Sequence, residues 1–299
     1  MSPQRRYRAF VSLTGLALGD ALGGLIAVPA DHPTVVERRL PPAPWPWSDD
    51  TEMACSVYRV LTRHGRVDQD ALAASFAEHH DCNRNYGMSV GRVLHQVRDG
   101  APWRRLAHEM FGGQGSYGNG GAMRVAPLGA WFADDPTWAA QEAALSAQVT
   151  HTHPEGVAGA VAVAVAAALA ASPTPPGSAV EFLDAVLRHT PPGQVHQGVR
   201  AALDLVGHPG ERHVAAVLGT GREVSAQDTV PLALWIAARH LGSFEEAVWA
   251  AVRLAEDVDT VAAIVGGVVA ARVGPAGLPE SWLQACEPPP PWACGLGGA

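Results

Sequence analysis

The 299-residue sequence contains no lysine, because all 21 of its Lys+Arg residues are arginine. This absence excludes several large enzyme classes. A Walker-type phosphate loop uses a lysine to reach the phosphates, pyridoxal-phosphate enzymes form a Schiff base with one, and protein kinases carry one in their signature. The chemistry of this chain must therefore use carboxylates, hydroxyls, histidine, backbone amides or metal ions.

Cysteine is scarce and scattered. The four cysteines are Cys55, Cys82, Cys286 and Cys294, and no two of them form a C-x-x-C pair. Sequence motifs for structural zinc and for redox exchange need such close spacing, so neither is predicted. Scattered cysteines in a chain of this size are typical of a reduced intracellular protein, and we expect a cytoplasmic location.

Charge is sparse as well. Charged residues make up 17 % of the chain, the net charge is −8, and hydrophobic residues reach 47 %. The acidic balance argues against a general nucleic-acid or anionic-membrane binder. The apolar content is sufficient for a large core.

Two apolar stretches resemble membrane-targeting segments. The basic residues 5–8 precede an apolar run at 9–18, but Asp20 and the glycines at 15, 19 and 23 favour a buried first helix over a signal peptide. Residues 156–171 are almost entirely Ala and Val, yet this run is shorter than the roughly 20 residues that span a bilayer. We predict that it is a central, buried helix and expect no membrane association.

Helical patterns dominate the chain and strand patterns are scarce, so we predict an all-α fold. A single multi-helix domain is expected over 1–285. The tail 286–299, rich in proline and then glycine, is predicted to be disordered. Ser178 and Ser243 are predicted N-caps, the second with Glu246 three residues on. The predicted helices are 10–22, 51–64, 70–80, 88–99, 103–110, 136–150, 155–171, 179–189, 195–206, 214–218, 229–240, 244–254 and 260–273.

Two similar acidic segments each open a predicted helix. They are Ser48-Asp49-Asp50-Thr51 and Asp257-Val258-Asp259-Thr260. Helix capping would explain either one alone, since Asp, Ser and Thr are favoured at helix N-termini. A cap needs one acceptor, however, and each segment has two acids plus hydroxyls. These hard oxygen donors favour Mg²⁺ or Mn²⁺, with two ions shared by bridging carboxylates.

Two further segments have weaker signals. The glycine-rich 116–124 ends in a helical Ala-Met-Arg and could hold an anion on backbone amides with Arg124 nearby, although such a stretch is more often only a turn. His151 and His153 precede the Ala/Val helix. They could bind zinc, but no third ligand has suitable spacing, and a polar helix entry explains them equally well.

In this order, the segments resemble the ADP-ribosylglycohydrolase family. The matching residues are Gly15-x-x-x-Gly19-Asp20-Ala21-Leu22-Gly23, Ser48-Asp49-Asp50-Thr51, Gly118-Asn119-Gly120-Gly121-Ala122-Met123-Arg124, Thr150-His151 and Asp257-x-Asp259-Thr260. Each motif is short, but together they cover nearly the whole chain in the family's order. The resemblance implies an all-α, orthogonally packed fold and hydrolysis of the C1″ glycosidic bond that joins ADP-ribose to an acceptor.

The resemblance also implies residue roles. Two Mg²⁺ or Mn²⁺ ions would be the cofactors, and the partner would be ADP-ribose or an ADP-ribosylated acceptor, which includes nucleic acid only if that is the modified acceptor; we expect a monomer. Asp49 and Asp257 would orient or deprotonate the attacking water. The implied metal ligands are Ser48, Asp49, Asp50, Asp257, Asp259 and Thr260. The implied substrate-binding residues are Gly118, Asn119, Gly120, Gly121, Met123, Arg124 and His151.

The chain departs from the family pattern in three places. Ser48 replaces a frequent Thr, and Glu256-Asp257-Val258-Asp259 replaces a Gly-Gly-Asp-Thr-Asp turn. Some members also carry a glutamate, as an acid or a gate, near the position of Ala27. Another acid would then have to serve, with Asp31, Glu37 and Asp81 as candidates. Two alternatives stay open: a non-catalytic ADP-ribose-binding protein, and a Mg²⁺-dependent phosphohydrolase that uses the same acids.

Overall fold

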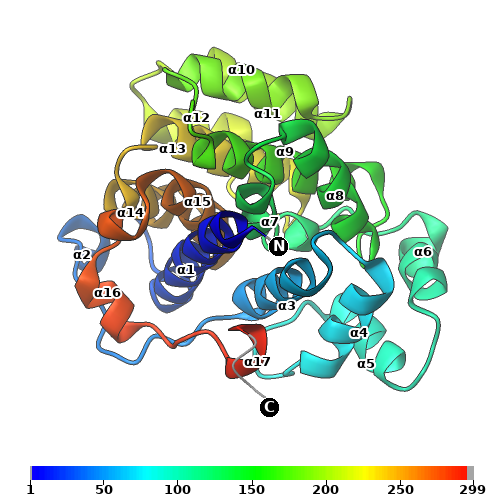
Figure 1. Cartoon of the computed structure of the whole chain (residues 1–299). Coiled ribbons are helices and arrows are strands. Elements are labelled where there is room, and N and C mark those ends of the chain that lie inside the picture. Colours follow the sequence, from blue (N-terminus) through cyan, green and yellow to red (C-terminus); the bar gives the residue numbers. More distant parts are fainter. Residues whose placement is uncertain (1, 295–299) are drawn as a thin grey trace.

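The structure, a computed structural model, describes residues 2–294 and consists of helices joined by loops (Figure 1). Within these residues the only β-type pairings are isolated bridges, Trp45 with Cys286 and Gly118 with Ser225. The predicted all-α fold is therefore confirmed. The helices are α1 Pro3–Leu25, α2 Pro33–Val36, α3 Asp49–His64, α4 Gln69–His79, α5 Met88–Arg98, α6 Trp103–Gly113, η1 Asn119–Gly121, α7 Ala126–Trp131, α8 Pro136–Gln148, α9 Pro154–Ala171, α10 Ala179–His189, α11 Gln194–Asp204, α12 Glu211–Leu218, α13 Ala226–Arg239, α14 Phe244–Leu254, α15 Val258–Val273, η2 Pro275–Gly277, α16 Glu280–Ala285 and α17 Pro291–Cys294.

The centre of the molecule is the pair α1 and α15, which are far apart in sequence but lie side by side (Figure 1). Glycines spaced four residues apart on α1 allow the close approach. A Cβ at Gly19 would lie 2.0 Å from the carbonyl oxygen of Ala262, and one at Gly15 would lie 2.6 Å from that of Gly266. Asp20 lies on α1, and Asp259, an implied metal ligand, lies in the first turn of α15.

The Ala/Val helix α9 lies in the interior, as predicted. By length and composition it is the one helix of residues 2–294 that could cross a membrane, but 72 % of it is buried inside the protein. Its small side chains allow α7, α8 and α13 to pack against it. A Cβ at Gly129 of α7 would lie 2.0 Å from the Ala164 carbonyl oxygen, so the two backbones touch.

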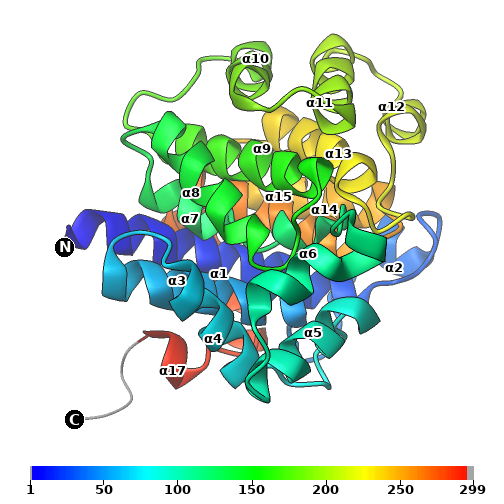
Figure 2. The ribbon, with the colours of Figure 1, turned by 90° about the vertical axis from the view of Figure 1, so that its right-hand side faces the viewer.

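The outer helices form two groups around this core. Figure 2 shows α10, α11 and α12 on one side of α9 and α13, while α4, α5 and α6 lie on the side of α3. Residues from the first turns of α3 and α15 and from η1 line one cavity, and the Asn119 side chain of η1 donates to Asp257 at the start of α15. Side chains from the N-terminal ends of these three elements can therefore meet.

Several helix ends differ from the sequence prediction. Ser178 caps α10 by accepting from the Glu181 N–H, as predicted. Ser243 precedes α14 but makes no side-chain cap, and Glu246 pairs with Arg38 instead. The short helices α2, α7, α16 and α17 were not predicted, because their apolar periodicity extends over less than two turns.

The prediction of a disordered tail is wrong for residues 286–294. This segment lies against the domain: the Glu287 N–H donates a backbone hydrogen bond of 2.9 Å to the Trp45 carbonyl, and the Trp292 ring stacks on His79 at 3.7 Å between centroids. Proline content suggested disorder, but aromatic and charged side chains supply the contacts that order the segment. The rest of the predicted tail, 295–299, lies outside the described residues.

Candidate active site

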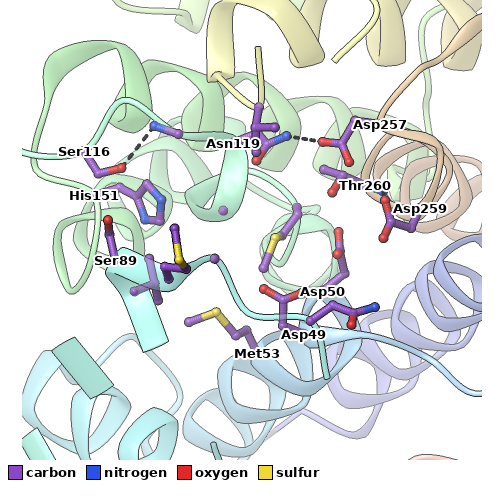
Figure 3. A pocket seen from close by; sticks show the side chains of 18 of the residues that line it. Asp49, Asp50, Met53, Ser89, Ser116, Asn119, His151, Asp257, Asp259 and Thr260 are labelled. Carbon is purple, nitrogen blue, oxygen red and sulfur yellow. Dashed lines mark hydrogen bonds between the residues drawn. The ribbon is translucent and has the colours of Figure 1, made fainter. Parts of the chain in front are cut away.

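A cavity of about 350 Å³ lies where α3, α5, η1 and α15 meet (Figure 3). This volume is within the range of small-molecule sites. The predicted site residues that line it are Asp49, Asp50, Gly118, Asn119, Gly120, Met123, His151, Asp257, Asp259 and Thr260. The structure thus brings together the two acidic segments, the glycine-rich segment and His151, which are separated by up to about two thirds of the chain. Ser48, Gly121 and Arg124 are the predicted site residues that do not line it.

The first acidic segment forms the N-terminus of α3. Ser48 is the N-cap, and its hydroxyl accepts from the Asp50 N–H at 3.3 Å and donates to Asp50 Oδ2 at 2.9 Å. The segment thus both caps α3 and places carboxylates at the cavity. Ser48 supports Asp50 from behind, while Asp49 and Asp50 face the cavity.

Asp20 holds this segment in place, a role that its sequence motif did not indicate. Its buried carboxylate accepts from the backbone N–H of Ser48 at 3.0 Å and of Thr51 at 3.1 Å. The Thr51 hydroxyl donates to the same carboxylate at 2.6 Å. The glycine-spaced packing of α1 against α15 thus places an acid directly behind the first turn of α3.

The second acidic segment forms the N-terminus of α15. Asn119 Nδ2 of η1 donates to Asp257 Oδ2 at 2.7 Å (Figure 3) and to the Thr229 hydroxyl at 2.9 Å. Asp259 Oδ1 accepts from the Thr260 N–H at 2.9 Å. Asp257 and Asp259 both line the cavity because α15 begins between them.

Burial and mutual repulsion disfavour charge on these acids. Burial, together with repulsion by neighbouring carboxylates, raises the pKa of Asp49 to about 8 and that of Asp257 to about 7. Burial raises the pKa of Asp20 to about 6, against the opposing hydrogen bonds from Thr51 and Ser48. The pKa of Asp50 lies well above its usual range for the same reasons, and its Oδ1 is buried without a hydrogen-bond partner.

This donor set suits hard cations. Carboxylate and hydroxyl oxygens are the ligands that Mg²⁺ and Mn²⁺ prefer, and a cation would neutralise the repulsion and satisfy the orphaned Asp50 Oδ1. Within residues 2–294, however, no group of three or more His, Cys, Asp or Glu side chains is arranged to hold a metal ion. A cation bound here would therefore also need hydroxyl oxygens, such as that of Thr260, and water.

Without bound cations, the protein should lose stability as the pH rises. The folded-state pKa values of Asp20, Asp49 and Asp257 exceed the ordinary value of 3.8, so the stabilising contribution is complete below that pH and is lost towards pH 8. In a chelator, we expect the Tm to fall by about 5 °C or more between about pH 5 and pH 8, measured by thermal denaturation. Excess Mg²⁺ or Mn²⁺ at the higher pH should reverse the fall. A Tm in chelator that is constant or rises over this range would contradict the prediction.

The glycine-rich segment provides fewer free amides than the sequence suggested. The Gly118 N–H donates to the Ser116 hydroxyl at 3.2 Å (Figure 3), and the Asn119 N–H donates to the Val224 carbonyl at 3.2 Å. Gly121 lies against α8 and α9 instead of the cavity, since a Cβ there would be 3.4 Å from both Ala147 Cβ and the Gly156 carbonyl oxygen. The segment therefore shapes the cavity wall more than it offers donors.

Arg124 was predicted to bind substrate, and the structure does not place it in the cavity. The side chain is fully buried and donates to the Ser146 carbonyl at 2.7 Å and to the Thr150 hydroxyl at 2.9 Å. Its guanidinium lies over the Phe76 ring, 4.6 Å from the centroid. The arginine lies three residues after the end of η1, but its side chain points into the core.

Arg124 acts on the cavity through His151. Because the Thr150 hydroxyl accepts from Arg124, its hydrogen is free to donate to His151 Nδ1, 2.7 Å away. Nδ1 is then an acceptor, and the ring proton lies on Nε2, which is the nitrogen near Gly118 and Gly120. Burial and the Arg124 charge lower the pKa of His151 to about 3, so the ring stays neutral and offers a single N–H to the cavity.

None of the acids suggested as substitutes for the glutamate near Ala27 reaches the cavity. Glu37 forms an ion pair with Arg39, and Asp81 accepts from the Asn83 N–H. Asp31, like these two, is absent from the cavity lining. The carboxylic acids among the cavity lining are Asp49, Asp50, Asp257 and Asp259.

The apolar and strained part of the cavity wall was not predicted from the sequence. Asn85, Phe111 and Val224 all line the cavity and have left-handed φ angles of 65°, 51° and 50°. Such conformations are rare for bulky or β-branched residues and are common at functional sites. A left-handed conformation could have been expected at Asn85, because asparagine adopts it more often than most residues. Nothing in the sequence indicates it at Phe111 or Val224. Four of the five methionines also line the cavity: Met53, Met88, Met110 and Met123.

Comparisons with known proteins agree with this arrangement. The family model described as ADP-ribosylglycohydrolase matches residues 1–297. The chain is 29 % identical to the ADP-ribosylhydrolase ARH3 of Mus musculus over 92 % of this chain and 86 % of that protein. It is 28 % identical to the ADP-ribosylarginine hydrolase Tri1 of Pseudomonas putida over 93 % of this chain and 73 % of that protein.

A solved structure has the same fold. The protein described as an ADP-ribosylglycohydrolase-related protein complex superposes with a TM-score of 0.60 and 26 % identity, over 96 % of this chain and 94 % of that one. The family match covers nearly the whole chain, including both acidic segments and the glycine-rich segment. The chain therefore belongs to the ADP-ribosylglycohydrolase family and is a glycohydrolase with an all-α fold.

Proposed function

We propose that this enzyme hydrolyses the C1″ glycosidic bond between ADP-ribose and its acceptor, with two Mg²⁺ or Mn²⁺ ions in the cavity. The observation that carries the proposal is the convergence of Asp49, Asp50, Asp257 and Asp259 on one cavity, with Asp20 directly behind them. Relatives named as hydrolases of ADP-ribosylated substrates support the substrate class.

The charges that line the cavity support the proposal that cations are needed to bind the substrate. The cavity lining contains four aspartates but no arginine, and its single histidine is neutral. The diphosphate of ADP-ribose would be repelled by such a wall unless positive charge were added. Bound divalent cations would supply that charge and would polarise water and the ribose hydroxyls.

The aspartates would then divide the acid and base work. Hydrolysis passes through an oxocarbenium-like transition state, which the surrounding carboxylates stabilise by their negative charge. Asp49 and Asp257 both face the cavity, and carboxylates placed there would accept a proton from water and return one to the leaving group. We assign the water to Asp257, because the side-chain amide of Asn119 donates through Nδ2 to its carboxylate and orients it.

The remaining lining residues would bind the rest of the substrate. The neutral His151 presents its Nε2–H, and the Ser89 and Ser116 hydroxyls also line the cavity as donors for phosphate oxygens. The methionines and Phe111 provide an apolar, adaptable surface for a flat ring.

The test is release of free ADP-ribose from a panel of acceptors carrying it on arginine, serine, a nucleic-acid base or an O-acetyl group. Each would be assayed with Mg²⁺, with Mn²⁺ and with excess chelator. We expect turnover on at least one acceptor and a loss of roughly 10²-fold or more in chelator. Metal-dependent ADP-ribose binding without turnover on any acceptor would contradict the proposed reaction. So would release of phosphate from a simple phosphoester with no affinity for ADP-ribose.

A further inference from the structure

The C-terminal segment, residues 286–294, is joined to a loop beside the cavity by the ion pair between Glu287 and Arg84. Arg84, in the loop between α4 and α5, contacts Glu287 with both arms of its guanidinium, at 2.7 Å from Nη2 to Oε1 and 2.8 Å from Nη1 to Oε2. Such a two-point pair is directional as well as attractive, because the planar fork matches the carboxylate. The pair joins residues 203 positions apart in the chain.

Arg84 also contacts Trp47 and Asp49, the two residues that flank Ser48, the N-cap of α3. Its Nη1 donates to the Trp47 carbonyl at 2.8 Å, and its guanidinium carbon lies 3.6 Å from the centroid of a Trp47 ring. Its backbone carbonyl accepts from the Asp49 N–H at 2.7 Å. The loop that bears Arg84 is thus bonded directly to the aspartate that faces the cavity.

The same loop forms one wall of the cavity. Asn85, Gly87 and Met88 follow Arg84 and line the cavity. On the other side of Arg84, the Asp81 N–H donates to Glu52 Oε2 at 3.0 Å, one turn along α3 from Asp49. The position of the loop therefore determines both the cavity wall and the orientation of the first turn of α3.

We propose that Arg84 and Glu287 are positioning residues, through which the C-terminal segment holds Asp49 and the 85–88 wall in the geometry needed for hydrolysis. The inference rests on the catalytic role proposed above for Asp49. Neither side chain lines the cavity, so neither touches substrate. Asp20 supports the first turn of α3 from α1, and Arg84 supports it from the loop that the C-terminal segment holds.

The functional consequence follows from geometry. Catalysis depends on reacting groups held to within a fraction of an ångström, and a misplacement of about 1 Å can cost about 10²-fold in rate. Loss of the Glu287 carboxylate frees the Arg84 guanidinium to adopt other rotamers. The Trp47 and Asp49 contacts then loosen together.

The experiment compares Glu287→Ala with Glu246→Ala. Glu246 is a matched control because it also forms a two-point pair, with Arg38 at 2.5 and 2.7 Å, and neither residue of that pair lines the cavity. We expect Glu287→Ala to lower kcat about tenfold with KM changed less than about threefold. Glu287→Gln, which keeps one acceptor oxygen, should recover part of the loss, and Glu246→Ala should leave kcat unchanged.

Amide hydrogen exchange supplies a second readout that needs no substrate. Exchange in a peptide covering residues 47–53 should become about fivefold faster or more in Glu287→Ala and stay unchanged in Glu246→Ala. Equal kcat in wild type and Glu287→Ala, or equal loss in both alanine variants, would overturn the inference. If the wild type releases no ADP-ribose from any acceptor, the proposed function fails, and the exchange rates alone then decide whether the segment holds Asp49.

Discussion

Replacing Asp257 with asparagine is expected to reduce the release of ADP-ribose by roughly 10³-fold, the scale of losing one acid–base group. The amide is nearly isosteric and keeps an oxygen that can accept from Asn119 Nδ2, which lies 2.7 Å from Asp257 Oδ2. It cannot take a proton from water and is a weaker ligand for a hard cation. The shape of the site is thus retained while its chemistry is lost.

The same substitution should stabilise the metal-free protein at alkaline pH. Burial and repulsion by Asp259 raise the pKa of Asp257 from 3.8 to about 7, so the cost of its ionisation to folding grows between these pH values and is complete above pH 7. Asparagine removes this cost, and the Tm in chelator near pH 8 should rise by a few degrees. Lower activity with a higher Tm would separate loss of chemistry from loss of fold.

A surface aspartate provides the control for this pair of measurements. Asp134 forms ion pairs with Arg5 and Arg8 on the outer surface, so Asp134→Asn should leave activity unchanged and should not raise the Tm. A loss of less than about tenfold in Asp257→Asn would show that Asp257 is neither the acid–base group nor a necessary ligand.

Replacing Gly19 with alanine is expected to lower the free energy of unfolding by about 3 kcal/mol or more, at the upper end of overpacking costs. The added Cβ would lie 2.0 Å from the Ala262 carbonyl oxygen and 2.6 Å from its carbonyl carbon. Both are backbone atoms within α15 and cannot turn aside. The helices α1 and α15 must therefore move apart, and Asp20 and Asp259 move with them.

Gly24 offers a control with the same chemical change on the same helix. A Cβ there would meet only Asp259 Cβ, at 3.9 Å, which is an ordinary contact. Gly24→Ala should therefore be neutral or stabilise the protein by up to about 1 kcal/mol, the helix preference for alanine over glycine. Thermal or denaturant unfolding of both variants checks the pair, and equal stability would contradict the argument for close helix packing.

Much of the fold could be predicted from local patterns. The bounds of α10 and α14 agree with the sequence prediction, and α9 is the buried Ala/Val helix that composition indicated. An apolar pattern that repeats over several helical turns indicates which residues face the core, and it does not depend on what those residues pack against. Helices of four to six residues, such as α2, α7, α16 and α17, leave no such signal in the sequence because they are too short to show a period.

The sequence predicted the site residues whose chemical type identifies them. It predicted less well those whose role depends on which way the side chain points. Acids and hydroxyls at two helix starts indicated that Asp49, Asp50, Asp257 and Asp259 act together, and all four line the cavity. The place of Arg124 in the glycine-rich segment indicated a substrate contact, but its side chain points into the core and reaches the cavity only through Thr150 and His151.

By itself, then, the sequence determined the longer helices, the glycine spacing that allows α1 and α15 to touch, and the two acidic helix starts. Only the tertiary structure decided that Asp20 lies behind the first turn of α3, that Arg124 is a core residue and that Glu287 reaches Arg84. The reason is physical. Periodicity and capping act between residues a few positions apart, whereas the direction of a buried polar side chain is set by partners that folding brings from distant parts of the chain.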